Sequence, residues 1–347
     1  MQLRQTDLAI NYFEKYQKLN KGIDENQFEQ YIALLKMKGY YTKAKNLLIN
    51  RLKQGDNERL KNELIWCDSA IYWSQNPIDI QVKNEHKINT IYSELSPVFH
   101  NQNVVFSSNR EGIIIQKKSE TNNEPFYNLY FSKRNQDGAS GNPKPFSRKV
   151  NTSEHETSVA FGPNNDKVFF SRIVECDQKQ LSKLYSARYS GGKWFDIESF
   201  VFNEKPFSFT HPCIEQQGKM FFFASDMEGG YGGFDIYVCI NMDEKWSAPI
   251  NLGPKINTSG NEITPFYSTD GHLYFASDTH PGMGGFDLFI AHDNNGDWTN
   301  ISNMKCPINS PMDDFGLTLD AENKNGLFSS NRAGGKGKED IYSFIKP

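Results

Sequence analysis

Downstream of residue 90, the chain is a succession of short apolar runs separated by turn residues. The runs are rich in β-branched and aromatic residues and are bounded by Gly, Pro, Asn or Asp, which is typical of strands rather than helices. Three runs form a unit that recurs five times, roughly every 50 residues. The first run of each unit is Ser96–Phe99, Ser158–Phe161, His211–Ile214, Thr264–Tyr267 or Gly316–Leu319.

Self-similarity at this period indicates a propeller, a solenoid or another repeat array. A fourth segment, such as Trp246–Leu252, follows the third run in the middle units. Four strands in each repeat form one blade, so the sequence predicts a mainly β protein with a five-bladed β-propeller. A six-bladed ring and a stacked β-solenoid are the alternatives, although a solenoid requires shorter and more uniform repeats.

The two ends of the repeat region indicate how the ring closes. The last unit stops after its third run, Asp340–Phe344, and therefore lacks an outer strand. The segment Pro77–Thr90 precedes the first unit and is similar to Pro249–Thr258, which lies between two later units. We predict that the N-terminal segment supplies the missing outer strand, because such sharing removes an exposed sheet edge.

Residues 1–75 have apolar positions at helical spacing, and residues 76–347 form the predicted propeller. Leu8, Ile10, Phe13 and Tyr16 begin one apolar helix face. The spacing of aromatic and small residues between Tyr31 and Ala44 resembles a tetratricopeptide (TPR) helix pair. An ordinary helical hairpin is the alternative.

Composition excludes several classes of protein. The formal net charge is -4 and the chain has no basic stripe, so nucleic acid is not an expected partner. No run of about 18 apolar residues is present, so no membrane-spanning helix is expected. The five cysteines are scattered without a CxxC pair and specify neither a disulfide framework nor a zinc site. We expect no cofactor and no metal.

Acidic residues recur just before the innermost predicted strands. Glu94, Glu156, Glu262 and Asp314 stand three residues before the Pro or its equivalent, and Phe209 holds this place in the third unit. At the mouth of an axial channel, two such charges about 10 Å apart would repel by about 1.7 kcal/mol at an effective dielectric constant near 20. One hypothesis is that the mouth binds a cation or a basic peptide end. The alternative, which we favour, is that each carboxylate accepts backbone N–H bonds and locks the ring.

His211 is the fifth candidate at this mouth, because it holds the position of Ser96, Ser158 and Thr264 in other units. A hydrogen-bonded structural histidine is its simpler interpretation. No Gly-x-Ser-x-Gly or HExxH motif is present, so no catalytic residues are predicted.

The segments Phe223–Tyr237 and Phe328–Tyr342 resemble the WD40-like "PD40" repeats of TolB-type propellers. Together with the N-terminal helices and Asn251–Thr258, they resemble a group of Bacteroidetes envelope proteins. These combine TPR-like helices, a PD40 propeller and usually an OmpA-like peptidoglycan-binding domain, and include a periplasmic lipoprotein of the type IX secretion and gliding machinery. The resemblance implies a periplasmic, outer-membrane-associated protein with envelope proteins as partners. It implies peptidoglycan contact only through an OmpA-like domain, which these 347 residues do not contain.

Three functions are therefore considered. The leading hypothesis is a non-enzymatic scaffold for protein–protein contacts in a bacterial envelope assembly. The first alternative is a propeller hydrolase acting on glycan or peptide, with Glu94, Glu156, Glu262 and His211 as its candidate residues. The second is a glycan-binding module that uses exposed aromatic residues such as Tyr231 or Phe234.

Overall fold

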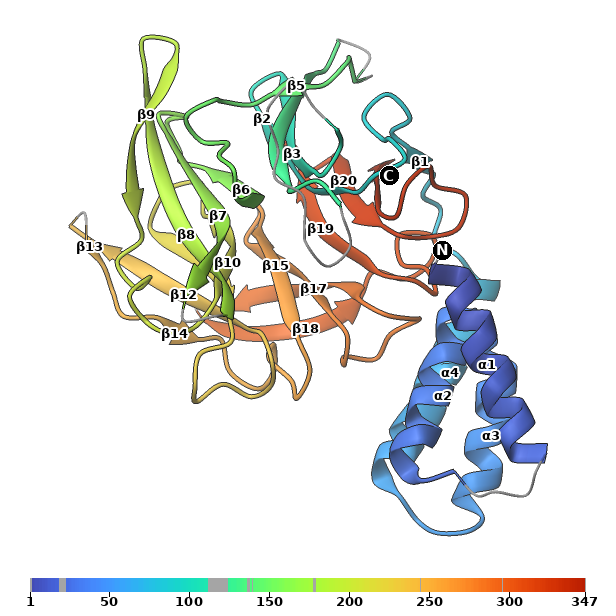
Figure 1. Cartoon of the computed structure of the whole chain (residues 1–347). Coiled ribbons are helices and arrows are strands. Elements are labelled where there is room, and N and C mark those ends of the chain that lie inside the picture. The colour runs from blue at the N-terminus through green and yellow to red at the C-terminus, as the bar shows by residue number, and fades with distance from the viewer. Residues whose placement is uncertain are drawn as a thin grey trace.

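The computed structural model describes residues 2–18, 23–111, 124–135, 138, 140–176, 179–243, 245–294 and 296–346. Its β region consists of five antiparallel sheets arranged around one axis (Figure 1). The prediction of a mainly β, five-bladed propeller is therefore confirmed, and the six-bladed and solenoid alternatives are wrong. The first unit carries an insertion between its second and third runs, residues 111–125, and most of it lies outside the described residues.

Each blade is a meander whose first strand lies next to the axis. Blade one contains β2 (Glu94–His100), β3 (Asn103–Ser108), β4 (Asn128–Lys133) and β5 (Lys144–Pro145). Blade two contains β6 (His155–Phe161), β7 (Lys167–Cys176), β8 (Lys179–Ser190) and β9 (Lys193–Ser199). Blade three contains β10 (Phe209–Ile214), β11 (Met220–Ser225), β12 (Asp235–Met242), β13 (Lys245–Trp246) and β14 (Ile250–Asn251). Blade four contains β15 (Glu262–Tyr267), β16 (His272–Ser277), β17 (Asp287–Asn294) and β18 (Asp297–Asn303). Blade five contains β19 (Asp314–Leu319), β20 (Asn325–Ser330), β21 (Asp340–Ile345) and β1 (Val82–Asn84).

The outer strand of blade five comes from the other end of the chain. β1 pairs antiparallel with β21, and Val82 faces Phe344. Figure 1 shows β1 beside the C-terminal end. This is the pairing expected from the similarity of Pro77–Thr90 to Pro249–Thr258, and it covers the edge that β21 would otherwise expose.

An asparagine side chain fixes each connection between blades. Its amide accepts a hydrogen bond from the N–H of a third-strand residue and donates one to the C=O of the same residue, as Asn89 does with Ile341 at 2.9 and 2.8 Å. The equivalent pairs are Asn151 with Leu129, Asn203 with Leu184, Asn257 with Ile236 and Asn309 with Leu288. Because Asn89 precedes the first blade and Ile341 lies in the last, this contact also helps to close the ring.

Every inner strand carries a one-residue β-bulge. In four blades a residue at the bulge has a left-handed backbone, with φ of 50° at Ser96, 53° at His211, 50° at Thr264 and 64° at Gly316. A bulge bends its strand and redirects a side chain. Here the redirected positions lie along the axis of the ring, where they border a cavity.

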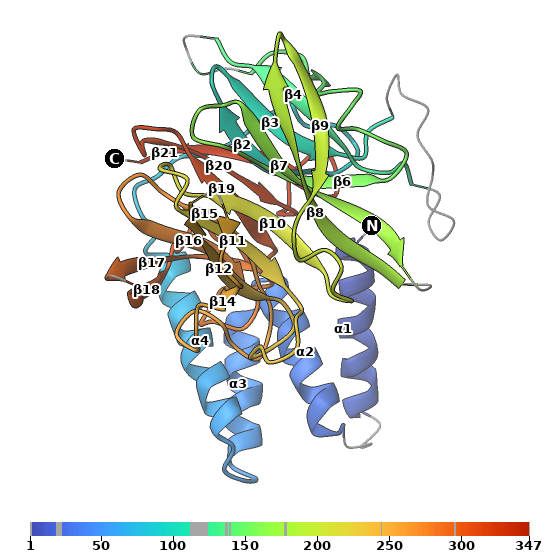
Figure 2. The ribbon, with the colours of Figure 1, turned by 90° about the vertical axis from the view of Figure 1, so that its left-hand side faces the viewer.

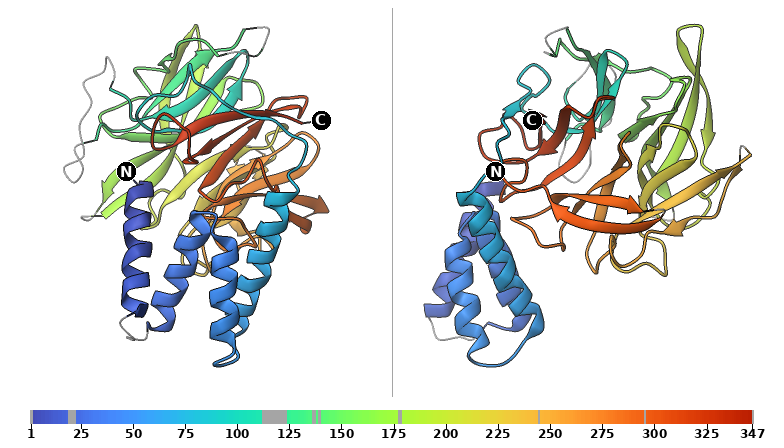
Figure 3. Two further views of the ribbon diagram at one scale, coloured as in Figure 1. Left: turned by 90° about the vertical axis from the view of Figure 1, so that its right-hand side faces the viewer. Right: turned by 180° about the vertical axis from the view of Figure 1, so that it is seen from behind.

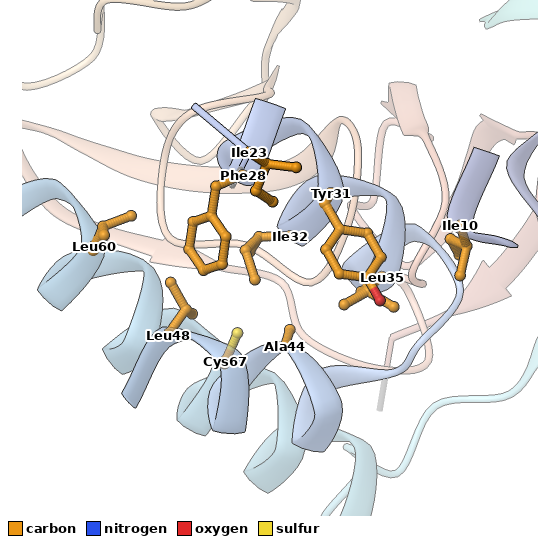
Figure 4. Close-up of a cluster of buried hydrophobic side chains, with 10 residues drawn as sticks. All are labelled: Ile10, Ile23, Phe28, Tyr31, Ile32, Leu35, Ala44, Leu48, Leu60 and Cys67. Atoms are coloured by element: carbon orange, nitrogen blue, oxygen red, sulfur yellow. The ribbon is translucent and has the colours of Figure 1, made fainter. Parts of the chain in front are cut away.

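The N-terminal region forms four helices, α1 (Gln2–Lys18), α2 (Glu25–Met37), α3 (Tyr41–Leu52) and α4 (Glu58–Gln75). They enclose an apolar core whose largest members include Phe28, Tyr31 and Leu35 (Figure 4). The helices lie together on one side of the blades (Figures 2 and 3). Tyr41 and Ala70 pack there against Met283 of blade four, so the two regions share a small buried interface. No helix among the described residues is long and apolar enough to cross a membrane.

Candidate functional site

The four acidic residues singled out by sequence, Glu94, Glu156, Glu262 and Asp314, lie at the junctions between blades, and we call them the interblade carboxylates. All four are fully buried. Each carboxylate accepts hydrogen bonds from the backbone N–H (2.6–3.1 Å) and the hydroxyl (2.7–2.8 Å) of a Thr or Ser four residues earlier. The backbone N–H of each acid donates to a carbonyl of the preceding blade, at 2.6–2.9 Å. The interblade carboxylates therefore fasten the incoming connection to the first strand of each blade, and the backbone N–H groups of the same residues join that strand to the preceding blade.

An arginine neutralises the carboxylate in three blades. Arg110 contacts Glu94 at 3.0 Å, Arg172 contacts Glu156 at 2.8 Å and Arg332 contacts Asp314 at 2.5 Å. Each guanidinium also donates to a backbone carbonyl of the incoming connection and lies over two aromatic rings, as Arg110 does over the rings of Phe106 and Tyr130. Burial raises the pKa of the Glu156 and Asp314 carboxyls, and the facing hydroxyl and guanidinium groups oppose that shift. These groups satisfy one another and leave no free charge for a ligand.

Blades three and four depart from this arrangement. In blade four, Thr279 stands where blades one and five have arginine, and burial raises the pKa of Glu262, which forms no ion pair within the described part of the chain. His280 Nε2 instead contacts the carbonyl of Ile256 at 2.8 Å. In blade three, Phe209 replaces the acid, and Lys183 Nζ donates to the carbonyl of Phe207 at 2.8 Å.

The inner strands enclose an axial cavity of about 180 Å³ that is partly open to solvent. Its wall is mainly apolar and is contributed by all five blades; it includes Val98, Phe99, Phe161, Ile214 and Leu317. None of the interblade carboxylates borders it. The structure therefore does not bring the five sequence-predicted residues into one acidic mouth, because the carboxylates are turned into the junctions and only His211 faces the axis. Among the described residues, no group of three or more His, Cys, Asp or Glu is arranged to hold a metal ion.

His211 is the largest polar side chain at the axis. Its backbone N–H donates to Ser171 Oγ of the preceding blade at 3.2 Å. Its Nδ1 is shielded from solvent and has no hydrogen-bond partner within the described ranges. Burial lowers the pKa of His211 to about 4, so the imidazole is neutral at physiological pH. The ring can exchange one neutral hydrogen bond, but within the described part of the chain no carboxylate orients it as a catalytic base requires.

A second concave surface lies between α1 and α2, and we call it the helical groove. Ala9, Tyr12, Phe13, Tyr16, Ile23 and Gln27 line a volume of about 400 Å³. The sequence pattern assigns Leu8, Phe13 and Tyr16 to a single apolar face, but Leu8 and Tyr16 are 57% and 41% exposed. Tyr12, which the pattern leaves out, is 70% exposed.

The aromatic residues proposed for glycan binding lie in the Gly-rich turn before β12. Tyr231 is 50% exposed, whereas Phe234 is partly buried and its N–H donates to Asn261 at 3.0 Å. Asp235 accepts the backbone N–H groups of Tyr231 and Gly232 at 2.7 and 3.2 Å. These contacts are those of a capped turn.

The sequence matches no family model and no curated protein sequence. Several solved structures are similar in fold. A TolB-like protein from Agrobacterium tumefaciens is 13% identical, with a TM-score of 0.43 over 77% of this chain and 98% of that one. The gluconolactonase XC5397 from Xanthomonas campestris is 9% identical, with a TM-score of 0.43 over 78% and 91%. The catalytic domain of a GH62 α-L-arabinofuranosidase from Coprinopsis cinerea is 8% identical, with a TM-score of 0.44 over 75% and 90%. Similar folds thus include TolB-like proteins and enzymes, and they leave the function of this chain undetermined.

Proposed function

We propose that this chain is a non-enzymatic scaffold that holds a partner protein through the helical groove. The observation that carries the proposal is the exposure of large apolar side chains in and beside this groove, among them Leu8, Tyr12 and Tyr16. Side chains at positions i, i+4 and i+8 form one stripe on a helix, and such a stripe beside a groove suits an apolar helix of a partner. Tyrosine is enriched at such interfaces because its ring is large and its hydroxyl tolerates water.

The chemistry of the axis supports a non-enzymatic role. A propeller hydrolase needs acidic groups that reach a substrate, and the interblade carboxylates are buried and hydrogen-bonded away from the cavity. Of the nucleophiles that border the cavity, Ser158 forms a hydroxyl–hydroxyl hydrogen bond with Ser171 at 2.7 Å, and burial raises the pKa of the Cys213 thiol to about 12. Neither of these contacts activates a nucleophile.

The location and the partner class follow from the repeat motifs rather than from the fold. The PD40-like segments Phe223–Tyr237 and Phe328–Tyr342 favour a periplasmic assembly at the outer membrane, as in type IX secretion. The partners we propose are envelope proteins. Contact with peptidoglycan would require a further domain.

Site-specific photo-crosslinking in envelope extracts tests the proposal. With a photoreactive phenylalanine in place of Tyr12, we expect one dominant protein adduct that Tyr16→Ser weakens. The same probe in place of Tyr231, an exposed tyrosine of blade three that does not line the groove, is the matched control and should give no such adduct. Equal labelling at both positions, or no labelling at Tyr12, would refute the proposal that the helical groove binds the partner. Glycan-array binding that Tyr231→Ala abolishes would instead establish the glycan-binding alternative, and release of product from glycan or peptide substrates would establish a hydrolase.

A further inference from the structure

The axial cavity has the size and lining of a small-molecule site. Its volume is about 180 Å³. An apolar protein cavity of about 150 Å³ accommodates one benzene molecule. Among the residues that the structure describes, the wall carries no Lys, Arg, Asp or Glu side chain. Because a charge moved into such surroundings would lose its hydration without gaining a partner, the cavity favours an uncharged guest.

His211 makes this nearly five-fold cavity asymmetric. The equivalent positions carry only Ser96, Ser158, Thr264 and Gly316, whose side chains are short or absent. Of these hydroxyls, Ser158 is bonded to Ser171 and Thr264 accepts the N–H of Gly316 at 3.0 Å. The imidazole is therefore the one large polar group at the axis with bonding capacity to spare among the described lining residues.

The two ring nitrogens of His211 have different surroundings. Nδ1 is shut off from solvent without a partner, so the nitrogen open to the cavity is Nε2. We assign the proton of the neutral ring to Nε2, because a buried N–H without a partner is rarer than an under-satisfied acceptor. The cavity then presents one N–H donor within apolar walls.

We propose that the axial cavity binds an uncharged organic molecule of about one aromatic ring, whose hydrogen-bond acceptor contacts His211 Nε2–H. Such a guest replaces water on the apolar wall and gives the imidazole the partner it lacks. This site is separate from the helical groove, so the proposal does not depend on the scaffold function.

Calorimetric titration with three probes tests the proposal. Acetophenone has one ring and a neutral acceptor, toluene has the ring alone, and benzoate has the ring and a charge. We expect acetophenone to bind most tightly, toluene to bind more weakly, and benzoate to give no binding heat. In His211→Ser, which copies the residue found in blades one and two, acetophenone should weaken by about tenfold, the factor of one neutral hydrogen bond, while toluene does not weaken. His292→Asn, at the outer part of blade four, is the control and should change neither.

Ala160→Leu locates the site. Ala160 borders the cavity, and the larger side chain should weaken acetophenone and toluene together. Melting temperatures check that each variant is folded, and the His211→Ser comparison stands if Ala160→Leu does not fold. The proposal is overturned if acetophenone gives no saturable heat, if folded Ala160→Leu binds it as wild type does, if benzoate binds equally well, or if His211→Ser weakens both neutral probes alike.

Discussion

Arg110 offers the sharpest test of how the blades are joined. Its guanidinium contacts Glu94 at 3.0 Å and the carbonyl of Ile88 at 2.6 Å, and it lies 5.2 and 5.0 Å from the ring centres of Phe106 and Tyr130. In Arg110→Met the apolar stem is retained, while the carboxylate and the carbonyl each lose a charged donor. Removing one member of a buried pair costs about 3–5 kcal/mol, because the other charge stays buried without compensation. We expect a loss of that size in the free energy of unfolding.

The double variant Glu94→Gln/Arg110→Met separates the charge from the packing. The amide introduced in place of the Glu94 carboxylate would keep partners, because the hydroxyls of Thr90 and Ser108 can rotate to accept or donate. With no charge left buried, the double variant should be more stable than Arg110→Met alone. Arg188→Met removes an exposed Arg–Glu pair at 3.5 Å and should cost at most about 1 kcal/mol.

Urea unfolding followed by tryptophan fluorescence measures all of these variants, with an unchanged denaturant slope as the sign that the same surface unfolds. Two results would refute the reasoning. One is a cost for Arg110→Met no larger than that for Arg188→Met. The other is a double variant as unstable as the single one, which would show that the lost contacts, and not the unpaired charge of Glu94, set the cost.

Three further predictions concern single side chains. Burial and the nearby Asp314 raise the pKa of Asp287 from 3.8 to about 8, so the contribution of Asp287 to stability falls as pH rises between those values. Asp287→Asn should flatten that part of a stability–pH curve measured by urea unfolding. Asn89→Ala removes two hydrogen bonds that help to close the ring and should lower stability by about 2–3 kcal/mol in urea unfolding, and a cost near zero would contradict the role of this asparagine. Iodoacetamide should label exposed Cys176 in the native protein but the buried thiols only after unfolding, as mass spectrometry can check.

The repeat could be predicted from sequence because each strand and turn carries its own local signal. Apolar runs end at turn residues, and the first unit is preceded by a segment that resembles a later connection between blades. Strand composition and turn chemistry depend on a few neighbouring residues, so they can be recognised in a single sequence. The pairing of Val82 with Phe344 follows from the same similarity, although the two residues lie at opposite ends of the repeat region.

The orientation of the interblade carboxylates could not be predicted from their positions alone. Standing before an inner strand, an acid such as Glu156 can face the axis or the junction. In the structure the Glu156 carboxylate faces the junction, where Thr152 and Arg172 both contact it. The sequence contains a signal for this, since a Thr or Ser lies four residues before each of the four acids and an Asn one residue before that. Recognising it requires knowing that these hydroxyls and the acids share one junction.

Blade three departs from the common arrangement at its junction, and it is also the blade that places a large polar side chain, His211, at the axis. Phe209 replaces the buried acid, and Lys183 donates to the carbonyls of Lys205 and Phe207 in the connection that enters blade three, so no ion pair among the described residues holds this junction. Two residues after Phe209, His211 enters the axial wall at a bulge that the other inner strands share. Blade three has the same bulge as the other blades, and Asn203 forms the same pair of hydrogen bonds with a third-strand residue, here Leu184. The fold of blade three therefore does not require an imidazole at the axis. Ser, Thr or Gly suffices at this position in the other four blades. The histidine is therefore better explained by a hydrogen bond to a molecule bound in the cavity than by the fold of blade three.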